Sequence, residues 1–521
     1  ILLRDKHPIG RPKFQEMLLE GPVNMVEPVI FDNITPELIQ KLALKMKGTA
    51  GPSLLDADEW RRMIGSKLYG TCGMDLCKSI ARLARMLSTE ALEDPKSVSA
   101  LMACRLIPLD KKPGIRPIGV GEVLRRLIGK AVTCVLKPEM KFAAGGLQLC
   151  VGQDGGAEAG IHSMRKIFEE DETHGIIQVD ADNAFNSINR KVLLHNIWIL
   201  CPEIARYANN CYAKPARLFV MGGLEISSSE GTTQGDPIAM PIYAIGILPL
   251  LFTIMRDMNG ERLNNCKQAA FADDLTGAGT LAALRKWWDN ILVKGPYIGY
   301  YAKPSKSWLI IKHEYSDQAK MAFKDAGINI TTEGRRHLGA VIGSEQSKNE
   351  YVEDKVNDWI SQIKKLADIA LIEPHAAYAA YVHGFQHRFT YVMRTIPGIS
   401  LIFKQLDNII TQSFIKNLFD RGCTDLELKL ISLPVRLGGL GIRLPSEMCN
   451  IQYKNSLTVT ESLVDHVVNQ EEILSIDEMA IKSEKARIKK EKEIRDHQRL
   501  NEIRNELTDE KRRLLDIICE K

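Results

Sequence analysis

The spacing of apolar residues predicts helices toward both ends of the chain. In the first hundred residues, an apolar helical period follows Thr35-Pro36-Glu37, where Thr35 suits the N-cap and Pro36 the first helical position. A second helix of this kind is expected from Cys77 to Leu87. An aromatic-rich helix is expected from Ala376 to Met393. Just before it, another helix is predicted whose apolar face is formed by Val352, Val356, Ile360, Ile363 and Leu366.

Short apolar stretches in the middle of the chain are typical of β-strands. Two of them flank the turn Asp110-Lys111-Lys112-Pro113-Gly114 and predict a β-hairpin, which is followed by a helix from Val123 to Leu136. The stretch Ile176 to Val179 predicts a buried strand. A second hairpin is expected from Gln268 to Gly277, and His337 to Gly343 is interpreted as one more short strand.

Composition favours a soluble globular protein of two to four domains, because the 521 residues are 45% hydrophobic and 26% charged. Net charge is only +4, so a nucleic-acid partner would have to meet a local basic surface. The eleven cysteines form no CxxC pair, and we interpret them as free thiols in a reducing, intracellular compartment, nuclear or cytoplasmic. No signal peptide is visible, and the opening on Ile1 favours a fragment of a longer protein.

One apolar run, from Pro237 to Met255, approaches the length of a membrane span. It contains Pro241 and Pro249 in addition to Pro237, and it begins directly after Asp236. Proline interrupts helices, so a buried core helix broken by proline is favoured over a span, and no membrane partner is expected.

Basic residues gather between residues 101 and 145, where nine Lys or Arg face three acids. The turn with Lys111 and Lys112 has two interpretations. One is a solvated lysine turn, and the other is a flexible cationic loop that folds over a polyphosphate, with Arg116 gripping phosphate oxygens in bidentate fashion.

Two separated groups of carboxylates follow apolar strands. Asp180 stands at the end of a strand, and Asp273 and Asp274 stand at the tip of the second predicted hairpin, where Asp also suits an ordinary turn. If the strands are neighbours, these carboxylates converge, and like charges held together need divalent cations. Two Mg²⁺ ions would then serve phosphoryl transfer, with substrate phosphates completing their shells. Asp182 is interpreted as a turn or cap residue.

A glycine-bracketed loop, Gly231 to Gly235, opens the apolar run. Asp236 suits the N-cap of a helix there and Pro237 its first position. Such an entrance exposes backbone N–H groups to a ligand, although a plain helix start has the same local pattern.

The ordered set of segments resembles the polymerase motifs of reverse transcriptases, specifically the retrotransposon type (non-LTR, LINE-like). The segments are Ile115-Arg116-Pro117-Ile118, Asp180-Ala181-Asp182-Asn183-Ala184-Phe185, Gln234-Gly235-Asp236-Pro237, Phe271-Ala272-Asp273-Asp274, Pro304-Ser305-Lys306-Ser307, Leu338-Gly339 and Leu437-Gly438-Gly439-Leu440-Gly441-Ile442. The resemblance implies an α+β right-hand polymerase with fingers, an antiparallel palm sheet and a helical thumb. It also implies RNA-directed DNA polymerisation with an RNA template, a DNA or RNA primer and dNTPs as partners.

The organisation expected on this basis has four parts. Residues 1–100 would be an N-terminal helical extension with the start of the fingers, and 101–345 the fingers and palm. Residues 346–450 would be the helical thumb and its connection. The highly charged residues 451–521 would be a long solvated helix or a partly disordered tail.

The resemblance also implies roles for individual residues. Asp180, Asp273 and Asp274 would form the metal triad for two Mg²⁺ ions, for which Mn²⁺ could substitute, and the Ala181 carbonyl would complete one shell. Asp274 would contribute more indirectly than the other two. Leu338 and Gly339 would form the primer-grip turn. Nucleotide-binding roles fall to Lys111, Lys112, Arg116, Asn183, Ala184, Phe185, Gln234, Gly235 and Lys306, the last of which also fits a surface lysine.

Phe185 separates the possible polymerase activities. An aromatic ring five residues after Asp180 would collide with a ribose 2′-OH and so favours dNTPs. An RNA-synthesising polymerase is therefore disfavoured. A catalytically silent, domesticated RNA-binding protein of the same fold is the alternative of a different class, and the intact aspartates speak against it.

Overall fold

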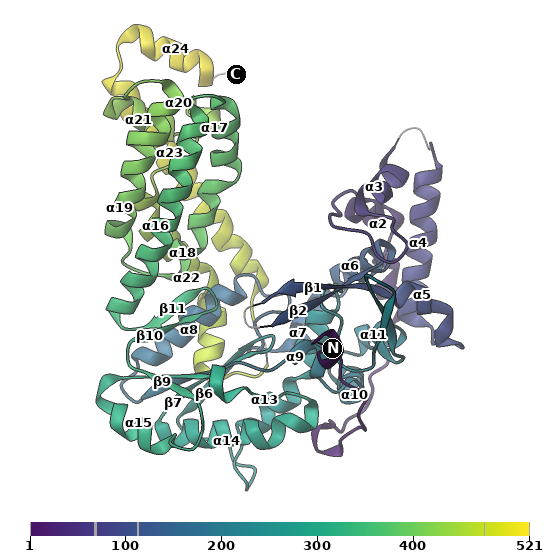
Figure 1. Ribbon diagram of the computed structural model, residues 1–521. Helices are drawn as coiled ribbons and strands as arrows, with labels where there is room; N and C mark the ends of the chain where they lie inside the picture. The colour runs from purple at the N-terminus through teal and green to yellow at the C-terminus, as the bar shows by residue number, and fades with distance from the viewer. Residues whose placement is uncertain (1, 67–69, 112–113, 474, 520–521) are drawn as a thin grey trace.

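The structure is a computed structural model that describes residues 2–66, 70–111, 114–473 and 475–519. Two groups of helices rise from a base that contains the β-sheets (Figure 1). One group contains α2 (Pro36–Ala43), α3 (Ala57–Gly65) and α4 (Cys72–Thr89). Thr35 caps α2 as expected, because its hydroxyl accepts a hydrogen bond from the Leu38 N–H at 3.2 Å.

A five-stranded sheet in the base has the order β6-β7-β3-β8-β9. Its strands are β3 (Gly175–Val179), β6 (Cys266–Phe271), β7 (Asp274–Gly279), β8 (Trp308–Ile311) and β9 (Asn329–Thr331). The first four pair antiparallel, but β9 pairs parallel to β8. The expectation of a wholly antiparallel sheet is therefore wrong at this edge, because the crossover through α15 (Ser316–Ala322) returns the chain to the same end.

Both faces of this sheet are covered. Alternate residues of β3 point to opposite sides, so Ile176 packs with Met164 of α8 (Gly156–Glu169), and Ile177 packs in the cluster of Trp287 on α14 (Leu281–Ile298). In Figure 1, α14 lies below the strands and α8 above them. The chain thus combines helices with mixed sheets.

The basic hairpin belongs to a second sheet, of order β2-β1-β4-β5. Its strands are β1 (Cys104–Asp110), β2 (Ile115–Gly121), β4 (Ala216–Val220) and β5 (Leu224–Ser228). The β1 and β2 strands pair antiparallel with Asp110 opposite Ile115, as expected, whereas β1 and β4 pair parallel. The helices that follow this hairpin and surround the core are α6 (Val123–Val135), α7 (Lys137–Ala144), α9 (Ala184–Ser187), α10 (Arg190–Leu200) and α11 (Pro202–Tyr212).

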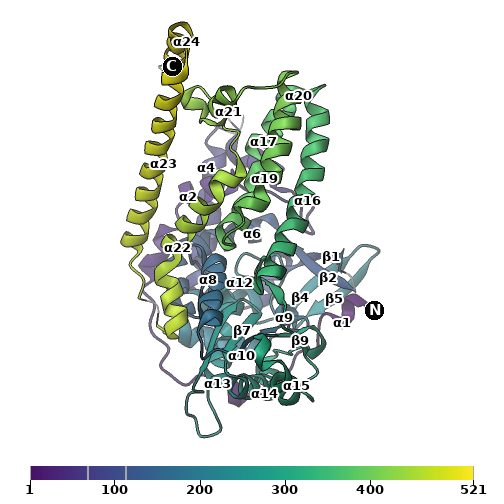
Figure 2. The same cartoon turned by 90° about the vertical axis from the view of Figure 1, so that its left-hand side faces the viewer.

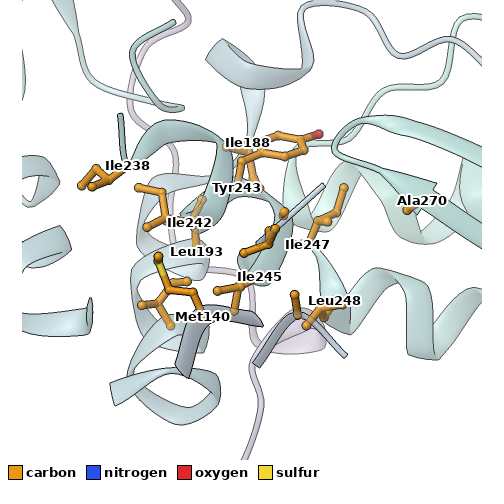
Figure 3. Packing of buried hydrophobic residues seen from close by; sticks show 14 of the residues in the cluster. Met140, Ile188, Leu193, Ile238, Ile242, Tyr243, Ile245, Ile247, Leu248 and Ala270 are labelled. Atoms are coloured by element: carbon orange, nitrogen blue, oxygen red, sulfur yellow. The ribbon is translucent and has the colours of Figure 1, made fainter. Parts of the chain in front are cut away.

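The apolar run after Asp236 forms two buried helices, α12 (Ala239–Gly246) and α13 (Leu248–Ile254), in the core shown in Figure 3. Among the described helices, none combines the length and apolar content that crossing a membrane requires. The expected N-cap is wrong. The cap position of α12 is Ile238, two residues later than expected. Asp236 Oδ1 accepts a hydrogen bond from the Ile238 N–H at 3.2 Å, while Asp236 Oδ2 bonds to side chains beneath the loop.

The segment expected as one strand near residue 340 is a hairpin of β10 (Gly334–His337) and β11 (Ala340–Gly343). Its turn is Leu338-Gly339, where both residues have positive φ. After it, α16 (Glu345–Ala370) begins the second group of helices. The expected helix over 376–393 is interrupted at Gly384, which separates α17 (Pro374–His383) from α18 (Thr390–Thr395).

The remaining helices complete this group. α22 is continuous across residue 450 and packs on α8, and α23 runs beside it (Figure 2). The charged segment after residue 477 is thus helical in α23 and α24. The bounds are α19 (Ser400–Ile409), α20 (Lys416–Phe419), α21 (Asp425–Ser432), α22 (Pro445–Asn469), α23 (Glu478–Glu506) and α24 (Asp509–Cys519).

Candidate active site

The two groups of aspartates meet at one end of the five-stranded sheet. β3 pairs antiparallel with β7, and Val179 lies opposite Leu275, so Asp180 follows the last pair of β3 just where β7 begins. In the hairpin, Phe271 pairs with Asp274, so the two turn residues are Ala272 and Asp273, and Asp274 is the first residue of β7. The tip is therefore one residue earlier than predicted.

Two buried side chains hold this turn. Gln148 lies against Ala272, whose N–H donates to Gln148 Oε1 at 2.8 Å, while Gln148 Nε2 donates to the Ala272 carbonyl at 3.2 Å. Ala272 has φ +57°, a conformation that non-glycine residues seldom adopt without support. The Tyr300 hydroxyl donates to the Asp273 carbonyl at 3.0 Å. The backbone of the turn is thus positioned by residues far away in the sequence.

The backbone at Asp180 is fixed from the segment that precedes β8. The Asp180 N–H donates to Ser307 Oγ at 3.2 Å, and the Lys303 N–H donates to the Asp180 carbonyl at 2.7 Å. This segment contains Lys306 in a short 3-10 turn, Pro304–Lys306. The motif around Lys306 therefore lies beside Asp180, although the two are far apart in sequence.

A cavity of about 590 Å³ opens at this end of the sheet. Most of the residues predicted for catalysis and nucleotide binding line it together. They are Lys111, Arg116, Asp180, Ala181, Asn183, Ala184, Phe185, Gln234, Gly235, Asp273 and Lys306. The hairpin β1–β2, the end of β3, the loop before α12 and the β6–β7 turn thus contribute to one site.

Three of the predicted residues that the structure describes stand apart from this lining. Asp274 is exposed at the start of β7 beside the cavity. Leu338 and Gly339 form the β10–β11 turn, which Tyr391 and Tyr351 hold through hydrogen bonds from their hydroxyls to the two carbonyls. Lys112 lies outside the described residues.

The carboxylates repel one another. Desolvation and the neighbouring Asp180 raise the pKa of Asp273, and the cations Arg116 and Lys111 oppose this effect. Partial desolvation, together with repulsion from Asp273 and Asp180, raises the pKa of Asp274 to about 6. The site therefore concentrates negative charge opposite Arg116 and Lys111 of the β1–β2 hairpin.

Phe185 forms a rigid part of the wall. Its ring stacks on Tyr243 of α12, with centroids 4.5 Å apart and planes inclined by 23°. The Phe185 carbonyl accepts a hydrogen bond from the Thr232 N–H at 2.7 Å. Gly231 has φ +67°, and a Cβ there would lie 2.2 Å from the Phe185 carbonyl oxygen, so only glycine allows this close approach.

The Gln234-Gly235 loop rests on β2 and on a buried ion pair. The Gly119 N–H donates to the Gln234 carbonyl at 3.0 Å. Below the loop, Asp236 Oδ2 accepts from Arg125 Nη2 at 2.5 Å and from the Tyr212 hydroxyl at 2.7 Å. Reasoning from the sequence missed this network, because no local pattern marks residues that meet across more than a hundred positions.

Two further cations at the site were also missed. Lys6 lines the cavity and lies 3.6 Å from the Asp182 carboxylate, and Lys303 lies 3.9 Å from it. Asp182 lies in the turn before α9, as expected, and its carboxylate pairs with these cations. The alternative interpretation as a cap is wrong, since Asn183 holds the N-cap position of α9. The N-terminal segment reaches the site because the Lys6 carbonyl accepts from Asn183 Nδ2 at 2.8 Å.

The carboxylates of Asp180 and Asp273 suit a Mg²⁺ ion that the protein holds only in part. Within the described ranges, no group of three or more His, Cys, Asp or Glu side chains is arranged to hold a metal ion. Asp180 and Asp273 nevertheless line one cavity and repel each other, and Mg²⁺ accepts one or two carboxylates when water and substrate phosphates supply the rest of its shell. The residues therefore suit a cation that binds together with its substrate.

Comparisons with known proteins identify one distantly similar structure and no family. No family model matches the chain, and no curated protein matches it. Among solved structures, the chain is similar to an apo telomerase from Candida tropicalis, truncated from the C-terminal domain, with a TM-score of 0.34 and 11% sequence identity. The match covers 49% of this chain and 55% of the telomerase chain.

Proposed function

We propose that this chain is an RNA-directed DNA polymerase, a reverse transcriptase of the retrotransposon type. One observation carries the proposal: Asp180 and Asp273 line a single cavity with Arg116, Phe185 and Gln234, although these residues come from four separate segments. Carboxylates that converge opposite Arg116 and Lys111 suit the transfer of a nucleotide from a triphosphate. The five-stranded sheet would be the palm, and the helices from α16 onward would include the thumb.

In this proposal each side chain has a defined task. Asp180 and Asp273 would hold two Mg²⁺ ions, with the Ala181 carbonyl as a further ligand and Asp274 as an indirect contributor. When bound, the ions would neutralise charge that develops on the attacking and leaving oxygens. Arg116 and Lys111 would bind the triphosphate, since neither forms an ion pair within the described part of the chain.

The remaining residues would select and align the partners. The Phe185 ring, held by Tyr243, would exclude a ribose 2′-OH and so favour dNTPs. Gln234 and Gly235 would border the nucleotide and the template base, and Lys306 would donate a proton as pyrophosphate leaves. The Leu338-Gly339 turn would position the primer, whose 3′-OH attacks the α-phosphate.

Primer extension tests the proposal directly. The full chain is given an RNA template, a DNA primer and Mg²⁺, with either dNTPs or NTPs. We expect extension of the primer with dNTPs. Asp273→Asn should abolish this extension. Asp317→Asn, which changes an almost fully exposed carboxylate, should leave it intact. Equal extension with NTPs would favour an RNA-synthesising polymerase. Tight binding of the hybrid without any extension would favour a silent RNA-binding protein.

A further inference from the structure

A second cleft, of about 500 Å³, lies between α8, α22 and α23, and shares no lining residue with the candidate active site. In Figure 2, α23 lies on the left and the β1–β2 hairpin on the right, so the cleft is remote from the basic hairpin. The cleft is rich in positive charge. Its described lining contains two carboxylates, Asp154 and Glu158, and six cations, Arg394, Arg443, Lys485, Lys489, Lys492 and Arg495.

Internal ion pairs neutralise only half of these cations. Lys485 Nζ lies 2.6 Å from Asp154, Arg394 lies 3.3 Å from Glu158, and Arg443 shares Asp496 with Arg436 at 3.5 and 3.9 Å. In contrast, Lys489, Lys492 and Arg495 make no ion pair with any residue that the structure describes. Three positive charges therefore remain available on the wall formed by α23.

The ion-paired Lys485 and the three cations that make no ion pair with described residues form a row along one face of a helix. Lys485, Lys489, Lys492 and Arg495 are spaced by four, three and three residues, so they lie on the side of α23 that faces the cleft. At about 1.5 Å per residue, the row is roughly 15 Å long. It thus spans about four phosphates of a stacked nucleic-acid strand, in which they are about 3.4 Å apart along the axis.

The cations also crowd one another. Desolvation, together with the proximity of Arg443, Arg436 and Arg495, lowers the pKa of Lys492, and Asp496 only partly opposes this effect. Holding these charges together costs free energy that a bound anion would recover. The described lining also contains the apolar residues Met448, Ile451, Val459 and Ile488 and the polar residues Gln452, Asn455 and Ser456, but no aromatic side chain. The described lining therefore offers no aromatic platform for base stacking, and its cations favour recognition of the phosphodiester backbone.

We infer that the cleft between α22 and α23 is a second nucleic-acid site, which binds the phosphodiester backbone of an RNA strand independently of its sequence. A linear row of cations along one wall of a cleft suits a strand of regularly spaced phosphates better than it suits a flat membrane surface. The site would tether a template or transcript away from the site of polymerisation. Binding here does not require catalysis, so the inference stands or falls separately from the proposed function.

The experiment uses the full chain and a fluorescent, unstructured RNA of mixed sequence without a primer. Lys489→Gln/Lys492→Gln removes two cations of the cleft, and Lys482→Gln/Lys490→Gln removes two exposed cations of the same helix that do not line it. We expect the first variant to weaken binding about tenfold and to reduce the salt slope, d log K/d log[salt], by about 1.4, that is, about 0.7 for each phosphate contact. The second variant should change affinity less than twofold.

Two further variants complete the experiment. One tests whether charge or the identity of the side chain matters, and the other tests whether the cleft acts independently of the candidate active site. Lys489→Arg/Lys492→Arg keeps both charges and should bind RNA like the wild type, whereas loss of binding there would overturn a role in backbone recognition. In an Arg116→Gln background, the loss caused by Lys489→Gln/Lys492→Gln should be unchanged, because separate sites contribute additively. Equal losses in the cleft and control variants would overturn the inference. So would binding of the wild type to phosphatidylserine vesicles, but not to RNA, at the same salt concentration.

Discussion

The Arg125 guanidinium and the Asp236 carboxylate form an ion pair beneath the Gln234-Gly235 loop, with 2.5 Å between Nη2 and Oδ2. Their side chains are 2% and 3% exposed, so water does not solvate either charge. The Tyr212 hydroxyl donates to the same carboxylate oxygen, and it also accepts the Thr233 N–H at 3.3 Å. The loop that borders the candidate active site thus rests on a buried, hydrogen-bonded charge pair.

Breaking this pair on one side should be costly. Asp236→Asn leaves the Arg125 charge buried without a counter-charge, and we expect the free energy of unfolding in urea to fall by about 3–5 kcal/mol. Arg125→Met/Asp236→Leu removes both charges and should recover most of this loss. A double variant as unstable as the single one would show that the pair acts through packing instead of charge.

Phe185 should control sugar selection. The preference for dCTP over CTP is measured as the ratio of their kcat/KM values, and we expect it to be roughly a hundredfold in the wild type. Phe185→Ala should lower this ratio at least tenfold, to about ten or less. Tyr243→Phe is the matched control, because it keeps the stacked ring under Phe185 and removes only a buried hydroxyl that has no partner within the described residues. Unchanged selectivity in Phe185→Ala would remove Phe185 from this role.

The two adjacent aspartates of the turn should differ in importance. Asp273 lines the cavity and Asp274 does not, so Asp273→Asn should reduce kcat more than Asp274→Asn does. We expect a loss of about a thousandfold or more for Asp273→Asn, comparable to the removal of a central electrostatic group. Single-turnover extension measures the difference. A larger loss in Asp274→Asn would reverse the assignment.

Gln148 should be needed for the shape of the turn. Gln148→Leu leaves the Ala272 N–H and carbonyl buried without partners, which costs about 1–3 kcal/mol for each group. We expect lower stability and a fall in kcat larger than the change in KM. Ala272→Gly serves as the control, because glycine adopts φ +57° readily and should preserve both activity and stability. Full activity of Gln148→Leu would contradict this role.

His162 should make stability depend on pH. Burial and the nearby Arg165 lower its pKa to about 4, while its unfolded value is 6.5. The unfolded state therefore binds more protons between these values, and stability is complete above pH 6.5 and falls as the pH drops toward 4. The loss is about 3 kcal/mol for a difference of roughly 2.5 pH units. The free energy of unfolding in urea, measured across this pH range, should depend less on pH in His162→Asn than in the wild type. His497→Asn changes an exposed histidine and should keep the pH dependence of the wild type.

Much of the local structure could be predicted because its cause is local. The Thr35-Pro36 start of α2, the basic hairpin and the strand before Asp180 all follow from capping, turn chemistry and apolar period within a few residues. Predictions failed where distant partners competed. The Asp236 carboxylate also binds Arg125, 111 residues earlier, which no local pattern predicts, and β9 is parallel because a crossover helix decides its direction.

By itself, the sequence determined the chemistry of the candidate site: which carboxylates, cations and aromatic ring are present, and in which order they occur. Only the tertiary structure decided that Asp180 and Asp273 share a cavity while Asp274 stands at its edge, and that Gln148 and Lys6 belong to the same site. The physical reason is the range of the interactions. Periodicity and turn propensity act between near neighbours, whereas sheet register and buried hydrogen bonds join residues that lie far apart along the chain.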